Sequence, residues 1–205
     1  VNPDEGVLCE KKEGRGVEKK TDLIITVRNQ KINLSVKCGS GNSVHQENID
    51  EFIKYLDNVS PLNQAEKNSI YDFHWCDGTY DNKGSVLDRK KRLSYRKSNE
   101  NDYKIYMGIL NGYKKAIFDR ALLGTKNIPD YLIHFKDKNA KIPIIFNYID
   151  LFKEHMKHSS NNHIGLFTIQ NTWPCLGGQD KGEKPKKHRN DMQLKIKNLK
   201  DLANE

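Results

Sequence analysis

The stretch TDLIITVRNQKINLSVK, residues 21–37, determines how the rest of the chain is interpreted. Residues 21–27 are mostly apolar and β-branched, which is typical of a strand. Residues 32–37 form a second, shorter run of the same kind. The polar residues 28–31 between them are short enough for a tight connection. The pattern therefore predicts a β-hairpin.

Side chains of a strand alternate between the two faces of its sheet. Ser35 and Lys37 are thus expected to point one way, and Leu34 and Val36 the other. Because Asp22 stands at the start of one strand and Lys37 at the end of the next, the hairpin brings both to one rim of the sheet. A carboxylate and an ammonium group held together in this way suit metal-assisted cleavage of a phosphodiester bond.

This arrangement resembles the core of the PD-(D/E)xK nucleases, best known from the type II restriction endonucleases. The resemblance covers residues 18–57, about a fifth of the chain. Here Thr21-Asp22 stands for the Pro-Asp pair, and Ser35-Val36-Lys37 stands for Asp/Glu-x-Lys. Some restriction enzymes with Ser-x-Lys supply the missing carboxylate from the helix that follows. The resemblance implies an α/β fold with a central mixed β-sheet flanked by helices.

The segment after the hairpin is expected to open that helix. Ser43 is a candidate N-cap, and Gln46 three residues later completes a capping-box pattern. Apolar residues then recur at helical spacing and predict a buried stripe. These residues are Ile49, Phe52, Ile53 and Leu56.

Three residues compete to replace the missing second acid. Glu47 lies nearest the end of the sheet, Gln46 matches another branch of the superfamily, and Glu51 lies further into the expected helix. Helical phase places Glu47 and Glu51 opposite the apolar stripe and Gln46 at its edge. The alternative for all three is a structural role, as a cap or as surface residues.

The resemblance also implies the chemistry of the site. Asp22 would anchor a Mg²⁺ ion, for which Mn²⁺ can substitute, and Glu47 would be its second protein ligand. Lys37 would stabilise charge on the phosphate in the transition state. Ser35 would orient a ligand or a water molecule.

Composition limits the organisation of the chain. The 205 residues, 36% of them hydrophobic, suit one core, so residues 1–205 are expected to form a single nuclease domain. Residues 61–125 are expected to be helical and to form a DNA-contacting insertion. Further strands are predicted at residues 131–135, 142–146, 164–169 and 191–197, with a helix at residues 148–155.

The net charge of +8 favours a polyanionic partner, and double-stranded DNA is the partner that the resemblance implies. The basic stretch 181–189 is long enough to cross a groove of DNA. Lysine and arginine contact phosphates and guanine, whereas glutamine pairs with adenine. The candidate DNA-binding residues are Lys184, Lys186, Lys187, Arg189 and Gln193.

Three further expectations concern location and assembly. The four cysteines are scattered, no apolar run reaches membrane-spanning length and no signal peptide is visible, which indicates a cytoplasmic protein with no membrane partner. Cutting both strands of DNA would suit a homodimer. Two alternatives stay open: a non-catalytic DNA-binding module on a nuclease fold, supported by Ser35, and a structure-specific repair or recombination nuclease.

Overall fold

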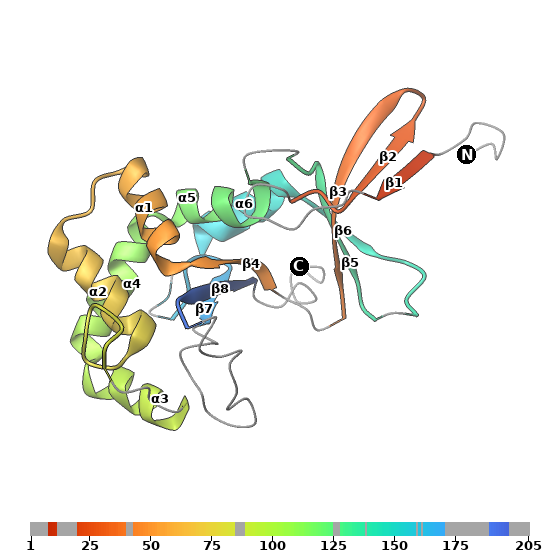
Figure 1. Ribbon diagram of the computed structural model, residues 1–205. Coiled ribbons are helices and arrows are strands. Elements are labelled where there is room, and N and C mark those ends of the chain that lie inside the picture. The colour runs from red at the N-terminus through yellow and green to blue at the C-terminus, as the bar shows by residue number, and fades with distance from the viewer. Residues whose placement is uncertain are drawn as a thin grey trace.

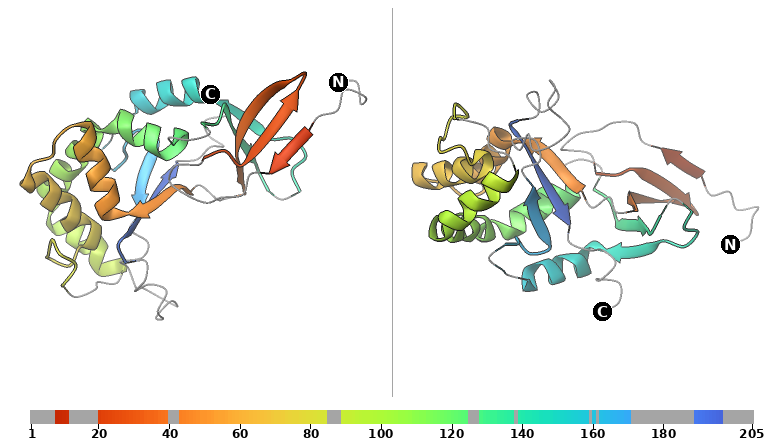
Figure 2. Two further views of the ribbon diagram at one scale, coloured as in Figure 1. Left: turned by 45° about the horizontal axis from the view of Figure 1, so that its top comes forward. Right: turned by 90° about the horizontal axis from the view of Figure 1, so that it is seen from below.

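Two β-sheets form the framework of the chain in the computed structural model (Figures 1 and 2). It describes residues 8–11, 20–39, 43–84, 89–124, 128–137, 139–158, 160, 162–170 and 189–196. The first sheet has five strands in the order β1 (Leu8–Lys11), β2 (Leu23–Val27), β3 (Gln30–Cys38), β5 (Tyr131–Phe135) and β6 (Ile144–Asn147). The second has the order β4 (Ser43–Asn48), β8 (Asp191–Ile196) and β7 (Phe167–Gln170).

The first sheet is mixed. β3 and β5 run parallel, and every other neighbouring pair in this sheet is antiparallel. The structure therefore confirms a mixed α/β class with flanking helices. It differs from the expectation of one central sheet, because the strands at residues 164–169 and 191–197 join β4 in a separate sheet.

The predicted hairpin is formed by β2 and β3. Val27 pairs with Gln30, so that Arg28 and Asn29 alone make the turn. Both have positive φ, 48° and 65°, as the type I′ turn of a two-residue hairpin requires. Asparagine tolerates this conformation better than most residues. The turn thus fixes the register that brings the two strand ends together.

The connection from β3 to β5 contains β4 and most of the helices. Within residues 61–125, the described part contains five helical segments but also a non-helical loop at residues 76–84. Figure 1 shows α1 to α4 gathered at the end of the molecule away from the β2–β3 hairpin. The helices are α1 (Ile49–Val59), α2 (Gln64–Trp75), α3 (Arg89–Ser98), α4 (Glu100–Gly112), α5 (Lys114–Phe118), the π-helix η2 (Asp119–Leu123) and, after β6, α6 (Tyr148–Lys157).

The prediction that Ser43 caps a helix through a capping box with Gln46 is wrong. Residues 43–48 form strand β4, paired with β8, and the helix begins only at Ile49. The N-cap is Asn48, whose side chain accepts a hydrogen bond from the Asp50 N–H. The apolar stripe of this helix is confirmed, because all four of its predicted members are buried in α1.

A buried histidine joins α6 to the segment before β7. The side chain of His155 is fully buried, and its Nδ1 accepts the Leu166 N–H at 3.0 Å. Its Nε2 donates to the Lys114 carbonyl at 3.0 Å, so the ring is neutral with its proton on Nε2. Gly165, with φ of +56°, lies against the ring, where an added Cβ would come within 2.4 Å of Nδ1. Burial lowers the pKa of His155 to about 4.

We expect the protein to lose stability in mild acid because of His155. The unfolded chain takes up a proton at this residue near pH 6.5, whereas the folded chain does not until about pH 4. This loss of unfolding free energy is therefore absent above pH 6.5. It grows as the pH falls toward 4 and reaches about 2 kcal/mol at pH 4.5. Urea unfolding at pH 7.5, 6.0 and 4.5 measures it. A His155→Gln variant should show a shallower pH dependence, and an identical slope would contradict this assignment.

Among the described residues, no helix combines the length and the apolar character needed to cross a lipid bilayer.

Candidate active site

The carboxylate of Asp22 is held at the entrance to β2. The Asp22 N–H donates to the carbonyl of Leu34 at 2.8 Å, although Leu34 is the β3 partner of Leu23, so the regular β2–β3 register ends at Leu23. Its Oδ2 accepts the Val36 N–H at 2.8 Å and the Ser35 hydroxyl at 3.2 Å. The side chain is nevertheless exposed. Asp22 is thus fixed in position while remaining open to solvent.

Ser35 and Lys37 belong to the same face of the sheet as Asp22. The Ser35 hydroxyl donates to the Asp22 carboxylate at 3.2 Å, and Lys37 follows Ser35 two residues along β3, on the same face of that strand. Ser35 is buried and Lys37 is half-buried. The buried Tyr148, at the start of α6, lies beside Ser35, and burial raises its pKa. Asp22 and Ser35 therefore meet at one end of the hairpin, and Lys37 is the next residue along the same face of β3.

Lys20 connects this group to the second sheet. Its Nζ lies 2.8 Å from His45 Nδ1 and donates to the Val44 carbonyl at 3.3 Å, both on β4. Burial, together with the neighbouring charge of Lys37, lowers the pKa of Lys20 to about 8. Lys20 is therefore close enough to Lys37 to experience its charge.

Glu47 and its partners form a buried ionic network behind Lys20. The side chains of Glu47 and His45 are each only 1% exposed, and His45 Nε2 lies 2.6 Å from Glu47 Oε1. Arg120, on η2, donates to both carboxylate oxygens at 3.1 and 2.5 Å. Burial alone would raise the pKa of Glu47, but the hydrogen bonds from His45 and Arg120 outweigh it and hold that pKa below its usual range. Burial lowers the pKa of His45.

The structure separates the three candidates for the second acid. Gln46 is exposed on β4 and donates to Asp191 at 3.1 Å, on the side away from His45 and Glu47. Glu51 is exposed on α1. Glu47 alone points inward, yet both of its oxygens are engaged by Arg120 and His45. As a metal ligand, Glu47 would first have to exchange Arg120 for the cation.

Asp22 fits the role of an anchoring carboxylate better than Glu47 fits that of a second ligand. The described contacts of Asp22 all use Oδ2, which leaves Oδ1 available toward solvent among the described residues. In the described part of the chain, no three histidine, cysteine, aspartate or glutamate side chains are grouped as metal ligands. Mg²⁺ commonly binds one or two carboxylates and takes its other ligands from water and substrate phosphates. Asp22 therefore suits such an ion.

The five candidate DNA-binding residues differ in whether the structure describes them and in what they contact. Lys184, Lys186 and Lys187 lie outside the described residues. Arg189 donates to Asp77 at 2.9 Å and to the Gly84 carbonyl at 3.3 Å, so it ties down the loop after α2. To contact DNA, Arg189 would have to leave the Asp77 carboxylate, which is fully buried. Gln193 is half-buried on β8, opposite Gln46 and Gln170.

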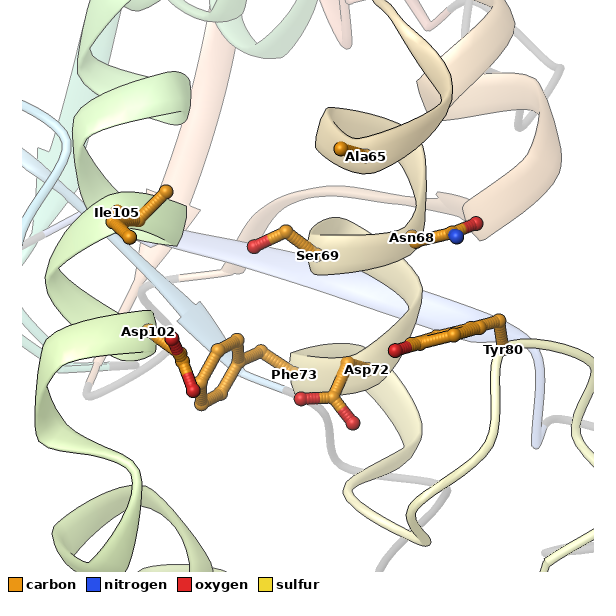
Figure 3. A pocket seen from close by; sticks show the side chains of 8 residues that line it. All are labelled: Ala65, Asn68, Ser69, Asp72, Phe73, Tyr80, Asp102 and Ile105. Atoms are coloured by element: carbon orange, nitrogen blue, oxygen red, sulfur yellow. The ribbon is translucent and has the colours of Figure 1, made fainter.

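A separate pocket lies between α2 and α4 (Figure 3). Asp72 and Asp102 face it from the two helices, with Tyr80 at its edge. Asp72 accepts a hydrogen bond from Tyr95 at 2.6 Å, and burial raises its pKa. None of the predicted site residues lines this pocket, so it is distinct from the group around Asp22.

Four members of the Asp22 neighbourhood were not predicted from the sequence: Lys20, His45, Arg120 and Tyr148. A local signal existed only for Lys20, which stands two residues before Asp22 in the sequence. The other three belong to β4, η2 and α6, which tertiary packing brings to the hairpin.

No known protein family matches the chain, and no curated protein matches its sequence.

Proposed function

We propose that this chain is a metal-dependent deoxyribonuclease that hydrolyses phosphodiester bonds of double-stranded DNA at specific sequences, as type II restriction endonucleases do. The observation that carries the proposal is the convergence of Asp22, Ser35 and Lys37 on one face at the end of the β2–β3 hairpin. The net charge of +8 supports a polyanionic substrate.

In this proposal each residue of the site has a separate role in hydrolysis. Asp22, oriented by the Val36 N–H and the Ser35 hydroxyl, would hold Mg²⁺. A bound Mg²⁺ ion would polarise the phosphate and lower the pKa of a coordinated water. Lys37 stabilises the negative charge that develops on the phosphate oxygens. Because Ser35 is a poor substitute for a carboxylate ligand, the ion would take its other ligands from substrate phosphate and water.

The second candidate is a DNA-binding module without catalytic activity. Two observations favour it. Serine stands where the resemblance expects an acid, and both carboxylate oxygens of Glu47 are already hydrogen-bonded, by Arg120 and His45. A nuclease that recognises DNA structure instead of sequence is the third. For the first candidate, a cytoplasmic homodimer with one site for each strand is the proposed assembly.

Incubation of supercoiled plasmid with the purified chain distinguishes these candidates. With Mg²⁺ we expect discrete fragments, and with EDTA none. A smear, or nicks confined to branched substrates, would favour the repair-type nuclease. Retarded but intact plasmid at every Mg²⁺ and Mn²⁺ concentration would favour the binding module. Sedimentation of the same sample with and without DNA tests the dimer.

A further inference from the structure

The first sheet has an apolar face that no described helix covers. In β2, β5 and β6 apolar residues follow one another directly, a pattern typical of strands that are buried on both faces. One face packs inward, where Leu132 and Phe146 join the main apolar cluster. In Figures 1 and 2 the described helices all lie to one side of this sheet. The opposite face therefore lacks the second layer that its residues call for.

The strand register defines this outer face. Two cross-strand rows make it up, Leu23-Leu34-Tyr131 and Val36-Ile133-Ile145. Because side chains alternate along β3, both rows point away from Ser35 and Lys37. The exposed fraction rises across the outer face, from 4% at Leu34 to 38% at Tyr131 and 60% at Ile145. Its open part thus lies over β5 and the edge strand β6.

The open part carries as much apolar surface as an interface between two proteins needs. Ile128, Ile142 and Ile149 stand within three residues of the ends of β5 and β6 and are 53%, 85% and 63% exposed. With roughly 150 Å² for a fully exposed large side chain, these three with Tyr131 and Ile145 offer roughly 450 Å². A standard interface buries about 800 Å² on each partner, of which somewhat more than half is apolar.

The distribution of charge favours a second copy of this chain as the occupant. Each chain carries a net charge of +8, so two copies repel each other wherever their charged surfaces meet. In a two-fold contact, residues near the axis meet their own copies, so this contact requires an uncharged surface. The outer face has no charged member. Exposed charges of both signs stand beside the strand ends, as in the polar rim of an interface: Asp130, Lys136, Lys141 and Asp150.

We infer that the outer face is the surface through which two copies of this chain pair about a two-fold axis. The inference rests on the proposed function, because it assigns a surface to the proposed homodimer. Contact through the outer face leaves Ser35 and Lys37 free on the other side of the sheet. A two-fold axis parallel to the strands would also bring the Asp22 ends of both copies to the same side of the dimer, as cutting both strands of one duplex requires.

Sedimentation velocity of the full chain without DNA, at concentrations of about 1–100 μM, tests the inference. Ile145→Lys places two like charges at the contact, and Ile145→Thr keeps a β-branched side chain but makes it polar. Ile105→Lys is the matched control, because Ile105 is also 60% exposed but lies on α4, at the other end of the molecule (Figure 1). Circular dichroism of each variant shows whether it has folded.

We expect the unchanged chain and Ile105→Lys to dimerise with the same Kd. Ile145→Lys should raise the Kd by at least about 30-fold and Ile145→Thr by about tenfold, and Ile145→Thr alone decides if Ile145→Lys does not fold. An unchanged chain that is monomeric at every concentration overturns the inference and leaves the outer face to another protein. A dimer that tolerates the Ile145 changes also overturns it.

Plasmid cleavage by the same samples separates this inference from the proposed function. A chain that dimerises through Ile145 but never cuts DNA supports the inference while the proposed catalysis fails. A monomer that cuts DNA overturns the inference alone.

Discussion

Replacing Lys37 by alanine should reduce Mg²⁺-dependent cleavage of plasmid DNA by at least about 10²–10³-fold, with much less effect on the affinity for DNA. The Lys37 ammonium lies on the same face as Ser35 and Asp22, at the point where negative charge would develop on the phosphate. In the proposed mechanism this interaction would strengthen in the transition state, so its removal should act mainly on the rate. Single-turnover cleavage and fluorescence anisotropy measure the two quantities separately.

Lys31 provides a matched control for this experiment. It is an exposed lysine on the same strand, β3, six residues away along the chain, or about 20 Å in an extended strand. Lys31→Ala should cleave at nearly the original rate. Unaltered cutting by Lys37→Ala would refute the assignment of the site, and an equal loss in both variants would point to general DNA affinity as the cause.

Replacing Arg120 by methionine should lower the free energy of unfolding by about 3–5 kcal/mol. The substitution leaves the Glu47 carboxylate, whose side chain is 1% exposed, without its bidentate partner. A buried charge that loses its counter-ion retains its full desolvation cost. Urea unfolding followed by circular dichroism at pH 7.5 measures the change.

Two further variants show whether the unpaired charge is the cause. Lys115→Met breaks the exposed pair with Asp119 at 2.7 Å, in which the two side chains are 69% and 35% exposed, and should cost less than about 1 kcal/mol. In the background of Arg120→Met, the change Glu47→Gln removes the stranded charge and should restore part of the lost stability. If the double variant is less stable than Arg120→Met alone, charge burial does not explain the loss.

The hairpin could be predicted because its determinants are local. Two apolar runs, a short polar turn and the alternation of side chains all lie within residues 21–37, and they predicted both strands. The expected meeting of Asp22 with Lys37 stays a prediction, whereas Ser35, on the same face of β3 as Lys37, does donate to Asp22. The helices α2 and α6 and the strand β5 were predicted for the same reason, since each has its own periodic pattern.

The segment around Glu47 could not be predicted in the same way. Ser43 and Gln46 fit a helix start by local rules, but residues 43–48 form a strand because β8, more than a hundred residues later, pairs with them. The error changed the direction of Glu47, since a strand sends it to the same side as His45 whereas the expected helix turned it outward. Arg120 and Tyr148 reach the site only through packing, for which the sequence carries no local signal.

The order of the strands along the chain affects when the molecule becomes complete during synthesis. β8 is the middle strand of the second sheet, although residues 191–196 are made after every other described element. Until they leave the ribosome, β4 lacks the neighbour that aligns His45 and Glu47, and so the anchor of Lys20 is missing. A nascent chain thus carries Asp22 and Lys37 long before β8 has paired with β4. Under the proposed function, this delay would keep partly made copies from cutting DNA.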